Sequence, residues 1–251
     1  MKVLPSFAVM VLLAGVAFAA VSSSGAAATP VPPSWSPSHL ESFAAAGGDS
    51  GGAQISFTYE NPKLQPAKYV VTLQENGSGH YLSETGAAVL DHTQLPVRGQ
   101  DRPIQISAGT RDLIFTAARQ SKYFSIPCDS GAKHIAFQGM KTLAYSGSDG
   151  HGSCSFNWSK DKQIQNLTDK FQAIASTLEE GAKLEVEYEH SRLSLDGELE
   201  LLAGLVHDGR ALELNNIAPI LNKIAEDDAI LKRAQRRARD LLAMANPAIA
   251  Q

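Results

Sequence analysis

The chain has 251 residues, of which 43% are hydrophobic and 19% are charged, and its formal net charge at pH 7 is −4. This length is enough for one large domain or two small ones, and the apolar content is that of an ordinary globular protein. The acidic balance argues against a general nucleic-acid-binding protein, because such proteins normally carry a basic face.

Residues 1–19 predict a secretory signal peptide. Lys2 supplies a short positive start, residues 7–16 form an apolar run too short to span a bilayer, and Ala17-Phe18-Ala19 fits the small-x-small pattern of a cleavage site. An uncleaved anchor helix is the alternative. We therefore expect a secreted or periplasmic protein with no integral membrane span after cleavage. Losing Lys2 leaves 21 basic against 26 acidic residues, a net charge of −5.

Residues 20–52 are rich in Ala, Ser, Pro and Gly, a composition that buries little apolar surface. We expect a flexible leader here. The motif Gly48-Asp49-Ser50-Gly51-Gly52 spells the serine motif of chymotrypsin-like proteases. That serine needs a histidine and an aspartate carried by the barrels around it, so a copy inside the leader is interpreted as linker.

Residues 53–160 are expected to form a β-rich α+β domain that starts with two strands. The alternating apolar residues of these strands are Ile55, Phe57, Tyr59, Tyr69, Val71 and Leu73. Asn76-Gly77 then predicts a hairpin, with a loop of two residues or of the four residues 76–79. Either loop places Leu82 and His80 on the face of Val71 and Leu73.

The middle of this domain is expected to contain a loop and a helix. Residues 86–106 are loop-like, since they include Pro96 and Pro103. Ser107 or Thr110 could cap a helix that runs to about residue 123, before Pro127.

The end of the domain is expected to contain further strands. Residues 134–145 form one strand or two, with Gly139 as a kink or bulge. Residues 146–152 form a turn, and the alternation of Cys154, Phe156 and Trp158 predicts another strand.

The period becomes helical at Asp161. The apolar stripe of this helix consists of Ile164, Leu167, Phe171, Ile174 and Leu178. Gly181 could end the helix, and residues 182–190 fit a strand or a continued helix, of which we favour the helix. The predicted fold class is α+β: a small antiparallel sheet packed with helices on one face, followed by an all-helical segment over residues 161–246.

Three helices are expected in the tail, near residues 196–206, 213–225 and 227–244. Asp227 and Asp228 are placed at the start of the last helix, and its basic residues are placed toward its end. That order suits the helix dipole and indicates a solvated, stabilised helix. An anionic docking face for a partner is the functional alternative for the basic residues.

The tail resembles a single HEAT-repeat hairpin. The matching elements are the proline-bearing segment Ala218-Pro219-Ile220-Leu221, an acidic turn at Asp227 or Asp228, and the segment Leu231-Lys232-Arg233-Ala234 with Ala238. The resemblance implies a hairpin that packs on the preceding domain, because a solenoid needs several stacked repeats.

The middle also resembles the small hairpin-and-helix domain of a family of bacterial exported proteins, over residues 54–180. The resemblance is carried by Tyr69-Val70-Val71-Thr72-Leu73 before Asn76-Gly77, by Tyr123-Phe124 at the end of a helix, and by the strands that follow. It implies a fold and no activity.

The two cysteines, Cys128 and Cys154, are expected to form a disulfide in an exported protein. The closed loop of roughly 25 residues would contribute about 3 kcal/mol in the loop-entropy model. Two free thiols joined by His134 or His151 in a metal site are the alternative, although the spacing fits no standard zinc pattern.

No catalytic constellation, cofactor site or metal site is predicted, and we expect a non-enzymatic binding or interaction module of the periplasm or cell exterior. Its expected partner is another envelope or extracellular protein, not nucleic acid. One alternative is a hydrolase that uses His151, Asp149 or His134 near the 146–154 turn, and another is a structural envelope component. Glutamates on the tail helices could supply carboxylate pairs or lie on solvated helix faces; they are Glu198, Glu200 and Glu213.

Overall fold

The computed structural model describes residues 52–85 and 98–245, which belong to one compact unit spanning Asp49–Gln251. The predicted signal peptide and all but the last residue of the predicted leader lie outside the described residues. No helix within the described ranges is both long enough and apolar enough to cross a membrane.

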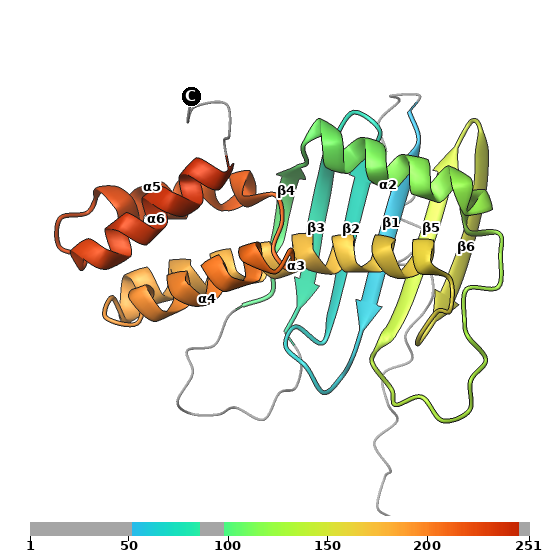
Figure 1. Cartoon of the computed structure of the whole chain (residues 1–251), viewed down its shortest axis with the longest axis horizontal. Coiled ribbons are helices and arrows are strands. Elements are labelled where there is room, and N and C mark those ends of the chain that lie inside the picture. Colours follow the sequence, from blue (N-terminus) through green and yellow to red (C-terminus); the bar gives the residue numbers. More distant parts are fainter. Residues whose placement is uncertain (1–51, 86–97, 246–251) are drawn as a thin grey trace, which may run out of the picture. The chain divides into compact units, whose positions relative to one another are not determined.

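Six antiparallel strands form one sheet in the order β4-β3-β2-β1-β5-β6 (Figure 1). Each strand pairs with its neighbours in an antiparallel register. Their bounds are β1 Gln54–Glu60, β2 Lys68–Gln74, β3 Ser78–Glu84, β4 Asp101–Gln105, β5 Met140–Gly147 and β6 Gly150–Phe156.

Two helices cover one face of this sheet, α2 Ala108–Gln120 and α3 Lys162–His190, with the short turn η1 Lys122–Phe124 following α2 (Figure 1). Alternate strand residues such as Phe57 and Val71 are fully buried against them, and the rings of Phe57 and Phe171 stack 5.1 Å apart. The predicted α+β class, a sheet followed by helices, is confirmed.

The expected faces of the β2–β3 hairpin are wrong. Val71 pairs with Tyr81, so Tyr81 is the buried residue, whereas Leu82 and His80 pair with Val70 and Thr72 on the opposite face. The connecting loop has three residues, 75–77, and Gly77 adopts φ +89°. A loop of two or four residues places Leu82 on the face of Val71. A three-residue loop that ends in a left-handed glycine shifts the register by one residue and places Tyr81 there.

Strand β4 lies inside the segment expected to be a loop. Pro103 argued against a strand, yet it pairs with His80 in the outermost strand of the sheet, where a missing N–H costs no ladder hydrogen bond. At the other end of the sheet, β5 begins at Met140 rather than near residue 134, and β6 ends before Trp158. The turn between them is confined to residues 148–149.

Helix α3 continues through Gly181 to His190, so the helical interpretation of residues 182–190 is confirmed. Its first half packs on the sheet. Its second half packs against α4 Leu195–His207, η2 Leu214–Ile217, α5 Ala218–Glu226 and α6 Lys232–Ala245 in a second core. Helix α3 therefore contributes side chains to both cores.

Gly181 packs tightly against Ile217 of η2. A Cβ atom built on Gly181 would lie 2.3 Å from Cγ2 of Ile217, so only glycine lets the two segments come this close. The glycine therefore reflects packing, not a helix end.

The charge order expected for the last helix is wrong. Asp227 and Asp228 lie in the turn after α5, and α6 begins at Lys232, so its basic residues occupy its first half. Two of them contact α4, and Lys232 pairs with Asp228 in the preceding turn. Arg233 and Arg237 both pair with the buried carboxylate of Asp196, at 2.8 and 3.2 Å.

Cys128 and Cys154 lie at disulfide distance, with Sγ atoms 1.95 Å apart and Cα atoms 5.9 Å apart. The pair joins the segment after η1 to strand β6, 26 residues further along the chain.

Candidate functional site

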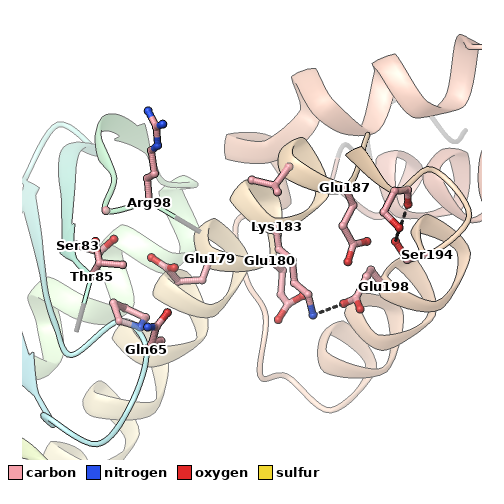
Figure 2. Close-up of a pocket in the computed structure, with 14 residues that line it drawn as sticks. Gln65, Ser83, Thr85, Arg98, Glu179, Glu180, Lys183, Glu187, Ser194 and Glu198 are labelled. Atoms are coloured by element: carbon pink, nitrogen blue, oxygen red, sulfur yellow. Dashed lines mark hydrogen bonds and ion pairs between the residues drawn. The ribbon is translucent and has the colours of Figure 1, made fainter. Parts of the chain in front are cut away.

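A cleft of about 380 Å³ lies where α3 leaves the sheet and meets α4 (Figure 2). One wall comes from the end of β3 and the segments that precede β2 and β4. The other wall carries most of the charged side chains, and its polar and charged residues include Glu179, Glu180, Lys183, Glu187, Ser194 and Glu198.

Helical spacing places three of these groups in the same wall. Glu180, Lys183 and Glu187 follow one another at steps of three and four residues, which brings them to one face of α3. Glu198 lies in the first turn of α4, and the Ser191–Ser194 turn between the two helices brings it back toward that face.

Glu179 closes the cleft on the side of the sheet, and one of its oxygens has two hydrogen-bond donors. Its Oε1 accepts hydrogen bonds from the hydroxyl of Tyr81 at 2.6 Å and from Nε2 of Gln100 at 2.8 Å. Tyr81 is completely buried, and its burial, more than the adjacent Glu179 carboxylate, raises the pKa of its hydroxyl well above the ordinary value. Glu179 therefore joins α3 to β3 and is a wall of the cleft.

Lys183 partly neutralises the cleft. Its Nζ lies 2.6 Å from Oε2 of Glu198, as the dashed line in Figure 2 shows. Desolvation lowers the pKa of Lys183, but Glu198, Glu180 and Glu187 together raise it above the usual value. Four glutamates and two cations, Lys183 and Arg98, line the cleft, so the ionised lining has a net charge of −2.

Glu187 is the most unusual group in the cleft. It is only 8% exposed, and its Oε2 is buried without a hydrogen-bond partner among the described residues. In Figure 2 its side chain points toward Glu198 and Ser194. Burial, followed by the nearby Glu198 carboxylate, raises the pKa of Glu187, whereas Ser194 and Lys183 act in the opposite direction.

Glu180 repeats this pattern seven residues earlier, about two turns along α3. Its Oε2 is also buried without a partner among the described residues. Burial is again the largest cause of a raised pKa, and Lys183 is the main opposing influence. A buried carboxylate oxygen without a donor is costly, so the two glutamates leave an unmet demand for positive charge or for hydrogen-bond donors.

The acidic lining does not form a metal centre. Within residues 52–85 and 98–245, no group of three or more His, Cys, Asp or Glu side chains is arranged to hold a metal ion. The ammonium group of Lys183 also stands among the carboxylates. The arrangement can accept hydrogen bonds from a cationic organic group, or it can hold a proton on Glu180 or Glu187.

The residues considered for a hydrolase near the 146–154 turn have other contacts. Asp149 accepts hydrogen bonds from Nε of Arg119 and from the hydroxyl of Tyr145, both at 2.7 Å, and these bonds lower its pKa. His134 and His151 are exposed, and within the described residues no hydrogen bond joins either imidazole to Asp149. The turn thus ties α2 to the sheet.

The glycines of this turn have a packing role. A Cβ atom on Gly150 would lie 2.5 Å from the ring of Tyr123, and one on Gly152 would lie 2.3 Å from the carbonyl oxygen of Tyr123. Tyr123 itself adopts φ +57° in η1. Because Gly150 and Gly152 have no side chains, there is room for Tyr123, which is held in a left-handed turn.

The carboxylates considered on the tail helices have different environments. Glu198 lies in the cleft, Glu200 pairs with Arg237 at 3.0 Å, and Glu213 accepts hydrogen bonds from the backbone N–H and hydroxyl of Ser107. Sequence reasoning did not single out Glu180 or Glu187. Their seven-residue spacing, with Lys183 between them, was a usable signal, but it became specific only once that helix face was known to be buried.

No protein-family model matches the chain, and no curated protein matches it in sequence.

Proposed function

We propose that the protein is a non-enzymatic binding module that works outside the cytosol and that its ligand enters the acidic cleft beside α3. The observation that carries the proposal is the Glu187 carboxylate, which is nine-tenths buried, faces the cleft and has one oxygen without a partner in the described part of the chain. The cleft volume of about 380 Å³ lies within the range of roughly 300–1,000 Å³ typical of small-ligand pockets.

Export is supported by two features of the chain. Residues 1–19 have the pattern of a signal peptide, and Cys128 and Cys154 lie at disulfide distance, which is common in oxidising compartments. Fractionation of the host cells, with N-terminal sequencing of the recovered protein, tests this part. An N-terminus near Ala20 in the extracytoplasmic fraction supports export, and an intact Met1 in the cytosolic fraction contradicts it.

An acid–base hydrolase is the second candidate function. The observation in its favour is that burial raises the pKa of both Glu180 and Glu187, as general acids require. Such a hydrolase would act from the cleft rather than from the 146–154 turn.

One experiment separates the two functions. The purified protein is incubated with panels of small cationic, neutral and anionic solutes, and thermal stability and solute concentration are followed together. Binding raises the melting temperature increasingly as the free solute concentration exceeds its Kd, and it leaves the solute intact. Turnover of a solute that is lost in Glu187→Gln would favour the hydrolase, and no response to any solute would count against the cleft as a site.

A further inference from the structure

The geometry points to a primary alkylammonium group as the chemistry that the acidic cleft binds, carried either by a free diamine or by a lysine side chain of a peptide. This inference rests on the proposed binding function and specifies its ligand class. The cluster of acidic residues alone would not support it. It also depends on Glu187, which is nine-tenths buried, faces the cleft and has one carboxylate oxygen without a hydrogen-bond donor in the described part of the chain.

The charge of the lining requires a cation. Lys183 pairs with Glu198 at 2.6 Å, and Glu179 is occupied by Tyr81 and Gln100. Glu180 and Glu187 remain, each with a buried Oε2 that lacks a donor among the described residues. Buried charges are stable only when paired, so a ligand that brings one positive charge to these two groups halves the net charge of −2 on the lining.

The placement of the acceptors favours an ammonium group over a guanidinium group. Apart from Oε2 of Glu198, which pairs with Lys183, the open oxygens belong to different residues, Glu180 and Glu187, seven residues or about two helical turns apart along α3. A guanidinium is a rigid fork suited to two oxygens of one carboxylate, whereas an ammonium is a compact charge with three rotatable donors.

The remainder of the cleft suits an alkyl stem. Val186 and Pro66 contribute apolar surface to the lining, and methylene groups pack along such surfaces while a charged head reaches polar partners. A volume of about 380 Å³ is at the small end of ligand pockets, which suits a single alkylammonium chain better than a folded macromolecular segment.

Isothermal titration calorimetry of the purified protein tests the ligand class with four probes of matched ionic strength. Cadaverine and the acetylated, amidated lysine residue represent the two sources of an alkylammonium group, and guanidinium and Mg²⁺ represent other cations. We expect saturable binding of at least one of the first two probes, at least tenfold tighter than binding of guanidinium or Mg²⁺. A preference for the diamine identifies a free amine as the source, and a preference for the lysine derivative identifies a peptide.

Two variants locate the binding. Glu187→Gln and Glu180→Gln are each expected to weaken alkylammonium binding about tenfold or more, because a hydrogen bond to a charged group is lost. Glu189→Gln is the matched control, since it removes the same charge from an exposed position of the same helix that does not line the cleft. Circular dichroism verifies that all three variants are folded.

The outcomes distinguish a failure of the proposed ligand class from a failure of the proposed binding function. Equal loss in Glu189→Gln and Glu187→Gln would show that only general surface charge attracts the probe, which overturns the inference. Binding of a neutral or anionic solute in the cleft, with none of the ammonium probes, would overturn the ligand class and keep the binding function. If no solute binds in the cleft, both proposals are wrong.

Discussion

Gln105 and Asn216 form a reciprocal pair that joins the edge of the sheet to the helical tail. The backbone N–H of Gln105 donates to Oδ1 of Asn216 at 2.8 Å, and Nδ2 of Asn216 donates to the carbonyl oxygen of Gln105 at 3.0 Å. The side-chain amide therefore substitutes for a neighbouring strand beside β4, whose outer edge would otherwise present unpaired backbone groups.

Asn216→Ala should lower the free energy of unfolding by about 1–3 kcal/mol, since it leaves the N–H of Gln105 without its partner and weakens the contact between edge and tail. Chemical denaturation measures the change. Asn222→Ala is the control, because Asn222 is exposed on α5. If both substitutions change the free energy of unfolding by equally small amounts, the pair of Gln105 and Asn216 does not stabilise the contact between the sheet edge and the tail.

Gly181→Ala should destabilise the protein although alanine favours helices. Its Cβ would lie 2.3 Å from Cγ2 of Ile217, and overpacking of this kind typically costs about 1–3 kcal/mol. Gly204→Ala in α4 should instead stabilise by up to about 1 kcal/mol, because no described atom outside its own helix backbone lies within 4 Å of the new methyl group. Thermal unfolding of the two variants should shift in opposite directions, and stabilisation by both would contradict the close approach of α3 and η2.

Removal of the pairing between Cys128 and Cys154 should lower the free energy of unfolding by about 3 kcal/mol, as expected for a loop closed over 26 residues of sequence separation. Denaturation with and without a reductant measures this difference. A double substitution, Cys128→Ala with Cys154→Ala, should be as unstable as the reduced protein and insensitive to the reductant. If the reductant also leaves the free energy of unfolding of the native protein unchanged, the two thiols are not joined.

Glu187→Gln should stabilise the protein at neutral pH. Because the pKa of Glu187 is raised in the folded state, folding favours the protonated carboxyl group, and stability falls as the pH rises from the ordinary value of 4.5 through the raised pKa. Glutamine does not ionise and escapes this loss. The advantage of Glu187→Gln over the native protein should therefore disappear as the pH falls below about 4.5, and Glu189→Gln should show no such pattern.

The sequence predicted the fold class well because strand alternation and the stripe on α3 are local patterns. Such patterns left two kinds of detail open. The face of Tyr81 depended on a loop of three rather than two or four residues, and β4 depended on an edge position that tolerates Pro103. Both are decided by pairing between strands, which local periodicity does not encode.

The cleft was harder to predict than the sheet for a related reason. A glutamate such as Glu187 normally indicates a solvated helix face, and only the packing of α4 against the second half of α3 buries it. The basic residues of α6 were misplaced because the turn at Asp227 ends one helix instead of starting the next. Glu198 was considered as part of a carboxylate pair. Its neighbours in the cleft lie on α3, and the sequence did not decide whether that helix continues past Gly181.

The carboxyl titration of Glu187, followed by ¹³C NMR in the purified protein with Glu187→Gln for assignment, tests the central claim most directly. We predict that the pKa of this carboxyl group lies above the ordinary value of 4.5 in the free protein and falls when an alkylammonium probe is added. An ordinary pKa that no cationic probe changes would mean that Glu187 is solvated and that the cleft holds no unmet charge.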